Sequence, residues 1–458
     1  MKNQILKKDQ DILTGSSYLI DSKKSFFDGH EYMLKHMDHN KAFTNHLKES
    51  ENISSEDLLN VYRKNYKEYR RLWLEQTNEC IKKSLYGKDM LDNGYAPLCI
   101  DVETAAICDL ACEFCYREAL ATPDKIISRK MFYKIVDQAA ELGVPSMKLN
   151  WRGEPLMNSK LPEMIAYAKS KGIIEVIINT NATHLSEKMG KKLIDAGLDF
   201  MIYSFDGGTK ETYEKMRPGR FRKNTFDSVY QNIVNFSKLR EKMGAKFPRT
   251  KIQMILTEDT YDEQDQFFDL FSDCVDEVTV TQYSERGGEI EDLNEKDRER
   301  YEELCDKLNF PKGTPYMRQS DGNIYLSDSR SPCEQPFQRI LFTYDGRAAM
   351  CCFDWGAMHP VGYVDSMCFH DEDADKRLVV ENIEKERKGF TLMPNVVMPP
   401  KFNRPKKVVE TIKEIWTGAE IESVRRAHGK NKVNSVKICE KCSFKDTYNW
   451  VGEEIAQN

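Results

Sequence analysis

The sequence lacks the long apolar runs that a chain needs to cross or leave a membrane. A membrane-spanning helix takes about eighteen or more consecutive apolar residues, and no such stretch occurs in this chain. The first residues, MKNQILKKDQDILTG, also lack the apolar segment of a secretory signal peptide. The two absences together predict a cytoplasmic protein with no membrane partner.

An excess of one charge is also missing. The 68 basic and 74 acidic residues give a formal net charge of −6 and are mixed along the chain. Because nucleic-acid-binding domains carry a basic face or stripe, we expect no nucleic acid partner. Hydrophobic residues make up 40% of the 458 residues, which is enough for sizeable cores in two or three domains.

Cysteine, by contrast, is present in an odd number of thirteen, three of them crowded into one short run. Cys108, Cys112 and Cys115 lie in ICDLACEFCYR, with the aromatic Phe114 just before the last. In a reducing compartment such thiols are more often metal ligands or free thiols than disulfides. Buried inert cysteines and a zinc site are the alternatives, but zinc favours four ligands and no fourth lies nearby. Iron–sulfur clusters are held by thiolates at such short spacings, and three thiolates leave the fourth corner of a cluster open.

The spacing with its aromatic residue resembles the signature of the radical S-adenosylmethionine (SAM) enzymes. The resemblance implies that Cys108, Cys112 and Cys115 hold a [4Fe–4S] cluster as catalytic residues and that the open iron chelates SAM. It also implies reductive cleavage of SAM to a 5′-deoxyadenosyl radical, which abstracts hydrogen from a substrate. A flavodoxin or ferredoxin-type reductant is then expected to supply the electron.

From Pro97 onward, short β-rich runs alternate with amphipathic helical stretches, which predicts a parallel sheet. Six such units match the open, partial (β/α)6 barrel of the TIM type found in the radical SAM family, an α/β fold. The predicted strands are 98–104, 146–151, 175–181, 199–205, 250–257 and 277–284.

The predicted domain organisation has five parts. The first is helical, with a helix that begins at Ser54 or Ser55 and ends at Gly87. The parts are a helical N-terminal extension over 1–95, the barrel over 96–290, a linker over 291–332, a small iron–sulfur domain over 333–447 and a tail over 448–458.

After the second strand comes Trp151-Arg152-Gly153-Glu154-Pro155, which resembles the G-G-E-P motif of the family, with Arg152 in place of the first glycine. The resemblance implies that Gly153 lets backbone approach SAM and that Glu154 and its neighbours accept hydrogen bonds from the SAM ammonium. An ordinary strand-to-helix turn is the alternative.

The ends of the next two strands carry further resemblances to SAM-binding motifs. Thr180-Asn181-Ala182 resembles T-N-G, which makes Asn181 a positioning residue near SAM, although asparagine is common at strand ends. The run from Ser204 to Arg217 resembles the S-x-D-G…R pattern, in which the two residues hold the methionyl carboxylate. A guanidinium can take a carboxylate with two parallel bonds; a solvated surface arginine is the alternative. The cofactor-binding residues that the resemblance implies are Gly153, Glu154, Pro155, Asn181, Ser204 and Arg217.

A second set of cysteines lies far along the chain. Twelve residues separate Cys333 from Gly346, four more precede Cys351, and Cys439 and Cys442 follow as a C-x2-C pair. The pattern resembles the opening of the SPASM domain, which carries auxiliary iron–sulfur clusters. The complete domain has further cysteines for a second cluster, but none follows Cys442 here, so one auxiliary [4Fe–4S] cluster is expected. A structural zinc is the alternative, and the neighbouring Cys352 could replace Cys351. Around these cysteines we expect a hairpin at Asp345-Gly346 and one helix over 412–429.

The substrate is less constrained by the sequence. Peptide maturases often carry an N-terminal winged-helix domain, and the helical N-terminal extension does not resemble one. We therefore expect a small metabolite, with a sugar or nucleotide sugar as the favoured class, and an oxidation or rearrangement as the outcome. The alternatives are a peptide or protein maturase and a non-catalytic iron–sulfur or zinc-binding protein.

Overall fold

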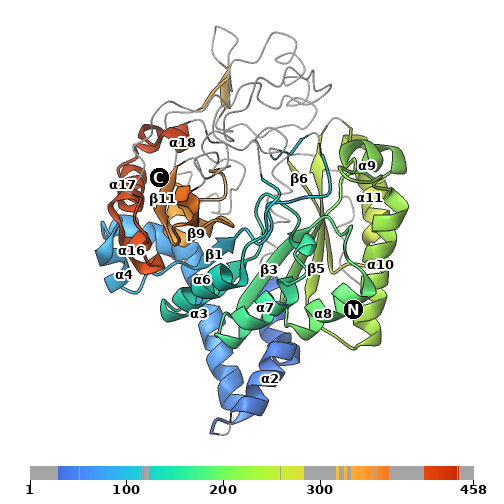
Figure 1. Ribbon diagram of the computed structural model, residues 1–458, viewed down its shortest axis with the longest axis horizontal. Coiled ribbons are helices and arrows are strands. Elements are labelled where there is room, and N and C mark those ends of the chain that lie inside the picture. The colour runs from blue at the N-terminus through green and yellow to red at the C-terminus, as the bar shows by residue number, and fades with distance from the viewer. Residues whose placement is uncertain are drawn as a thin grey trace.

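The computed structural model describes residues 29–50, 52–112, 114–115, 117, 123–257, 259–282, 316–318, 324–326, 332–354, 357, 359–370, 407–440 and 442. Its centre is a nine-stranded sheet with the strand order β11-β10-β9-β1-β2-β3-β4-β5-β6. Strands β1 to β6 are all parallel to their neighbours, and β6 and β11 are the outermost strands among the described residues, so the predicted partial barrel is confirmed (Figure 1). The six strands are β1 (Cys99–Val102), β2 (Ser146–Lys148), β3 (Glu175–Thr180), β4 (Phe200–Ser204), β5 (Arg249–Leu256) and β6 (Glu277–Gln282).

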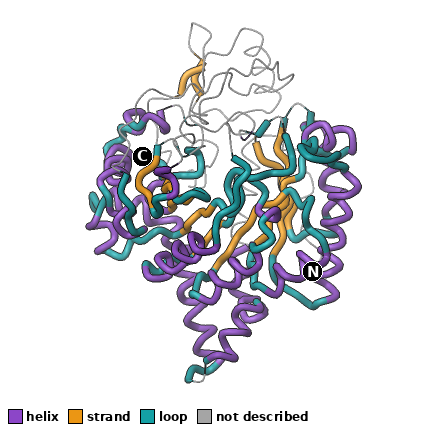
Figure 2. The backbone as a smooth tube through the Cα atoms, in the orientation of Figure 1, coloured by secondary structure: helices purple, strands orange, loops and turns teal. Residues whose placement is uncertain are grey.

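Helices connect these strands, as Figure 2 shows. Ser128, Ser186 and Thr225 each cap a helix by accepting a hydrogen bond from a backbone N–H in its first turn. Apolar side chains at helical spacing turn one face of each helix to the sheet, where they join a single large core. The connecting elements are α6 (Arg129–Glu141), η3 (Pro155–Met157), α7 (Leu161–Ser170), α8 (Glu187–Asp195), α9 (Lys210–Met216), α10 (Phe226–Lys242), η4 (Tyr261–Glu263) and α11 (Gln264–Phe271).

The described N-terminal residues before β1 are helical, as expected. Ser54 caps the long helix by accepting from the backbone N–H of Asp57, but the helix ends at Lys82, earlier than the predicted Gly87. The Tyr69 hydroxyl on this helix donates to Glu175 on β3 at 3.0 Å, so the helix is fixed to the barrel (blue in Figure 1). The elements are helical residues 29–36, η2 (Met37–His39), α2 (Lys41–Glu49), α3 (Ser55–Lys82) and α4 (Lys88–Asp92).

The C-terminal cysteine segment belongs to the same sheet as the barrel. Strand β9 (Arg339–Phe342) pairs in parallel with β1 along its whole length. The expected hairpin is present between β9 and β10 (Arg347–Ala349), and Gly346 in its turn has a φ of 93°, a conformation that favours glycine. The remaining elements here are α13 (Gln335–Gln338), β11 (Pro360–Tyr363) and α14 (Met367–His370). Before them, β7 (Tyr316–Arg318) and β8 (Ile324–Leu326) pair with each other in a separate two-stranded sheet.

The expected single helix over 412–429 is wrong, because the chain forms two helices there. A capping box between Thr411 and Glu414 begins α16 (Ile412–Thr417), and Gly418 takes an extended conformation before α17 (Ala419–Gly429). The break lets α16 pack on α6 while α17 packs on α13. Two short elements follow, η5 (Val433–Ser435) and α18 (Lys437–Glu440).

No helix in the described parts of the chain is long and apolar enough to span a membrane.

Arg425 on α17 is a fully buried cation that fixes this helix in place. Its guanidinium donates to three backbone carbonyls, those of Pro336, Tyr86 and Trp416, at 2.7 to 2.8 Å. It also stacks 3.9 Å from the Trp416 ring. Burial lowers the pKa of Arg425 to about 9, so the carbonyls are what compensate for desolvation.

Replacing Arg425 by methionine is expected to lower the free energy of unfolding by about 3 kcal/mol or more. The reason is that each buried carbonyl left without a donor costs about 1–3 kcal/mol. The matched control is R426M, since the neighbouring arginine is half exposed, pairs with Glu422 on the surface and lies 5.1 Å from the Tyr86 ring; its loss should stay below about 1 kcal/mol. Urea unfolding of both variants measures the difference, and equal losses would contradict this role for Arg425.

Three histidines in the N-terminal helices predict a pH dependence. Burial lowers the pKa of His30, His36 and His46 below the usual 6.5. As the pH falls through 6.5, the unfolded chain binds these protons before the folded chain does, so the free energy of unfolding falls. The Tm should therefore drop between pH of about 7.5 and about 5.5, and by less in the variant H30Q/H36Q/H46Q. An equal drop in both proteins would count against the prediction.

Candidate functional site

The three-cysteine loop follows β1 at the carboxyl end of the parallel sheet, where the active sites of such folds lie. Cys108, Cys112 and Cys115 form one apolar group with Leu110, Phe114 and Met216. Burial raises the pKa of Cys108, and the neighbouring Cys112 and Cys115 raise it further. Burial also raises the pKa of Cys112, to about 12. The three sulfurs therefore lie near one another, and a bound cation would be needed to hold them as thiolates.

No three His, Cys, Asp or Glu side chains within the described ranges converge as the ligands of one metal ion do. A four-iron cluster requires a different arrangement, because each cysteine binds a separate iron atom. The loop fits that requirement in its donor chemistry: three thiols of one short segment, close together and mostly buried.

The cysteine loop is held on two sides by backbone hydrogen bonds. On one side, the N–H of Ala111 donates to Pro218 at 2.9 Å and the N–H of Arg220 donates to the Asp109 carbonyl at 2.7 Å. On the other side, the N–H of Glu154 donates to the Ile107 carbonyl at 2.9 Å. The motifs after β2 and β4 therefore meet at this loop.

Gly153 brings the turn after β2 against the base of the cysteine loop. A Cβ at this position would lie 2.3 Å from the Ala105 carbonyl oxygen and 2.4 Å from that of Ile107. Only glycine permits this close backbone approach. Pro155 follows as the first residue of η3. The family motif implies that a glycine here lets the backbone approach SAM. The structure shows that this position also requires glycine because it packs against the backbone of the cysteine loop.

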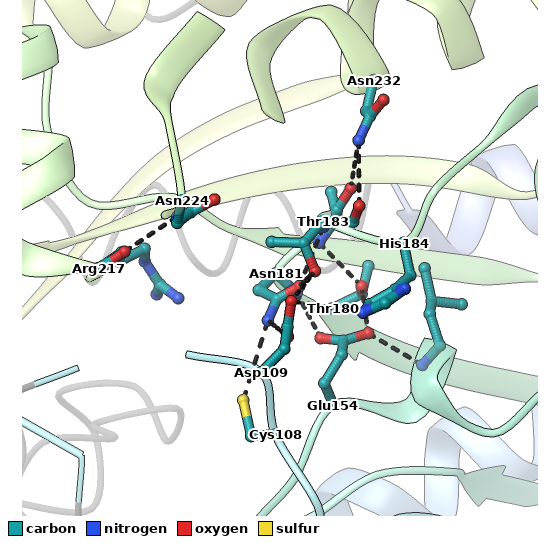
Figure 3. Close-up of polar contacts among 12 residues, drawn as sticks. Cys108, Asp109, Glu154, Thr180, Asn181, Thr183, His184, Arg217, Asn224 and Asn232 are labelled. Atoms are coloured by element: carbon teal, nitrogen blue, oxygen red, sulfur yellow. Dashed lines mark hydrogen bonds and ion pairs between the residues drawn. The ribbon is translucent and has the colours of Figure 1, made fainter. Parts of the chain in front are cut away.

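Glu154 joins the turn after β2 to the end of β3. Its buried carboxylate accepts hydrogen bonds from the Thr180 hydroxyl at 2.6 Å and from the N–H groups of Asn181 and Leu156 at 2.7 and 2.9 Å (Figure 3). Burial raises the pKa of Glu154 to about 7. The carboxylate therefore orders the two strand ends around the cysteine loop.

A polar cluster beside Cys108 was not predicted from the sequence, apart from Asn181. The Asn181 amide donates to Asp109 at 3.0 Å and lies 3.9 Å from the Cys108 sulfur. The Thr183 hydroxyl donates to the same carboxylate at 2.7 Å, and His184 lies 3.4 Å from it (Figure 3). The hydrogen bond with Asp109 raises the pKa of His184. In the sequence, the position of Asp109 directly after Cys108 was the one feature that could have indicated this cluster.

Arg217 is buried, so it is not a solvated surface arginine. Its guanidinium binds Asp206 at 2.8 Å through Nε, and its Nη1 lies 4.0 Å from the Cys112 sulfur. Asp206 in turn accepts from the N–H of Ile255 on β5 at 2.7 Å. Ser204 is the last residue of β4 and is half-buried. The ion pair with Asp206 therefore holds the Arg217 guanidinium beside the cysteine loop.

The second cysteine set gathers after β10. Burial raises the pKa of Cys351, as do Cys352, Cys439 and Cys442 close by. Cys333 lies before α13, and its backbone N–H donates to the buried His428 at 3.0 Å. None of the cysteines that the structure describes forms a disulfide. Three of the four predicted ligands, Cys351, Cys439 and Cys442, thus lie near one another.

Residues 102–271 match the Radical SAM superfamily, and this match begins at the last residue of β1 and covers strands β2 to β5 and all three cysteines of the loop. Residues 102–271 form a radical SAM domain. The cofactors of such domains are a [4Fe–4S] cluster and SAM, as the cysteine spacing predicts. The structural features described above, from the cysteine loop to Arg217, all lie within this domain.

Among curated proteins, the chain is 33% identical over 145 residues to Fe-coproporphyrin III synthase of Methanosarcina barkeri, covering 31% of this chain and 35% of that protein. It is 37% identical over 113 residues to a probable GTP 3′,8-cyclase of Methanococcus maripaludis, covering 24% and 37%. The chain thus spans about a third of the length of these relatives.

Two solved structures resemble the chain more broadly but more distantly. BtrN in complex with AdoMet and 2-DOIA covers 76% of this chain and 93% of its own, at 14% identity and a TM-score of 0.39. Streptococcus suis SuiB bound to precursor peptide SuiA covers 91% and 83%, at 15% identity and a TM-score of 0.45. No conclusion about function rests on similarities this low.

Proposed function

We propose that the chain is a radical SAM enzyme that abstracts hydrogen from a small metabolite. A SAM-bound [4Fe–4S] cluster supplies one electron and, from SAM, a 5′-deoxyadenosyl radical. The observation that carries the proposal is the position of Cys108, Cys112 and Cys115 at the carboxyl end of β1, inside a radical SAM domain. The buried Glu154 turn and Arg217 meet the same loop from two sides.

In this proposal the protein binds and orients the cofactors. The three cysteines hold the cluster, and the turn Gly153-Glu154-Pro155 and Asn181 position SAM at the ends of β2 and β3. Ser204 and Arg217 hold its methionyl carboxylate from the β4 side. Because Asp206 already occupies part of the Arg217 guanidinium, the carboxylate is expected to bind at the Nη1 side, which faces Cys112.

The N-terminal residues and the relatives support the proposed substrate class. The described residues between 29 and 92 form helices joined by short turns and contain no strand, which is not the architecture of a winged-helix leader-binding domain. The names of the relatives given above point to a porphyrin and to GTP, both small molecules. A sugar or nucleotide sugar remains the favoured substrate, and oxidation or rearrangement the favoured outcome. A peptide or protein maturase is the second candidate.

Cys333, Cys351, Cys439 and Cys442 are proposed to bind one auxiliary [4Fe–4S] cluster. Support comes from the mutual proximity of Cys351, Cys439 and Cys442. Cys351 is favoured over Cys352, because the Cys352 sulfur lies 3.9 Å from the Gln335 amide oxygen.

The test is a deuterium-transfer assay with anaerobically reconstituted protein, SAM and a reductant of the flavodoxin or ferredoxin type. Deuterated sugars and nucleotide sugars form one panel, and deuterated peptides form the other. Deuterium in 5′-deoxyadenosine with the first panel supports the proposal, and with the second panel it favours the maturase. A fully loaded protein that never forms 5′-deoxyadenosine would overturn the radical activity and leave a non-catalytic iron–sulfur protein.

A further inference from the structure

Arg152, which departs from the family motif, is one half of a buried ion pair. Its Nε and Nη2 donate to the two carboxylate oxygens of Glu103 at 2.7 and 2.8 Å. The side chains of both residues are at most 5% exposed. A bidentate pair of this kind fixes both distance and orientation, so the turn after β2 is attached rigidly to the end of β1.

Glu103 extends this attachment into the C-terminal hairpin. Its carboxylate also accepts from the backbone N–H of Tyr344, at 3.2 Å, and its own N–H donates to the Phe342 carbonyl at 2.9 Å. Tyr344 lies in the turn that leads from β9 to β10 and so to Cys351. The same carboxylate therefore binds both the SAM-side turn and the hairpin of the auxiliary site.

Trp151 makes a second, independent connection. Its indole N–H donates to the Cys352 carbonyl at 2.9 Å, and its ring lies 4.5 Å from the Arg152 guanidinium carbon. Cys352 directly follows Cys351, so this bond fixes the backbone that carries the proposed ligand. The residues Trp151 and Arg152 come immediately before Gly153 and Glu154.

We propose that Trp151 and Arg152 are positioning residues that couple the SAM site to the auxiliary site. Through them, the arrangement of the Cys351–Cys352 backbone sets the position of the turn that binds SAM. Coupling between two binding sites is reciprocal, so SAM binding also changes the surroundings of the auxiliary cluster. This inference rests on the proposed function, because it assigns ligands to both sites.

The experiment is a double-mutant cycle on SAM affinity, measured anaerobically by equilibrium dialysis. W151F keeps an aromatic ring but loses the indole N–H, and C351A removes the proposed auxiliary ligand. Each is expected to weaken SAM binding about threefold to tenfold, which corresponds to a coupling of about 1 kcal/mol. If the two act through one connection, the double variant should be little weaker than either single variant. R152K, which keeps the charge but cannot form both bonds to Glu103, should weaken SAM binding in the same direction.

W416F is the matched control, since the Trp416 indole also donates to a buried carbonyl, that of Tyr95 at 3.1 Å, before β1. It should leave SAM affinity unchanged. The second readout is the EPR spectrum of the reduced auxiliary cluster in the C108A/C112A/C115A background, which W151F should alter and W416F should not. Unchanged SAM affinity in W151F and R152K, or effects of W151F and C351A that simply multiply, would overturn the coupling. Absence of iron and sulfide from the triple-alanine protein would instead overturn the auxiliary cluster, while W151F would still test the positioning of SAM.

Discussion

Replacing Cys112 by alanine is expected to abolish the reductive cleavage of SAM. Cys112 is buried at the centre of the loop, between Cys108 and Cys115 and beside Arg217. Two thiolates cannot hold the cluster with one open corner, so the radical precursor would not form. The measurement is 5′-deoxyadenosine production by chromatography after chemical reduction, together with iron and sulfide content.

The control for C112A is C274A, because Cys274 follows α11, where its sulfur donates to the Phe271 carbonyl at 3.5 Å. C274A should keep full iron content and full activity. A C112A protein that still cleaves SAM reductively would refute the assignment of the catalytic cluster to this loop.

The second large effect is expected from the adjacent pair Cys351 and Cys352. With two [4Fe–4S] clusters the chain would bind about eight irons; C351A should bind about four, whereas C352A should bind nearly all of them. The reason is that Cys351 is buried close to Cys439 and Cys442, while the Cys352 thiol lies beside Gln335. Iron and sulfide analysis with EPR of the reduced proteins distinguishes the two variants.

The opposite result, iron loss in C352A alone, would assign the ligand to Cys352. Iron at about four per chain in the unmodified protein, with zinc bound in addition, would replace the auxiliary cluster by a structural zinc site.

The parallel strands could be predicted from the sequence because their signal is local. Each is a short β-branched or apolar run between helical segments, and all six formed where expected. The predicted cap at Ser54 is equally local. The end of α3 and the break at Gly418 were missed, since helix ends depend on what the neighbouring turns pack against.

The contacts of the candidate site were far less predictable. Asp206 and Arg217 are separated by ten residues, and only the fold makes them an ion pair. Glu103 and Tyr344 are farther apart still, and nothing in either local sequence indicates that they meet. The sequence identified which residue types carry the chemistry, while the polar partners that orient them depend on tertiary packing.

The pairing of β9 with β1 has a consequence for how the protein matures on the ribosome. The long stretch from Val102 to Arg339 must be synthesised before β1 acquires its second neighbour. Until then the nascent barrel exposes an unsatisfied strand edge, the kind of edge that promotes aggregation. Contacts so distant in sequence also slow folding. Recombinant fragments that stop after the barrel should therefore aggregate when they are expressed. Chimaeras with related proteins should exchange β1 and β9 together.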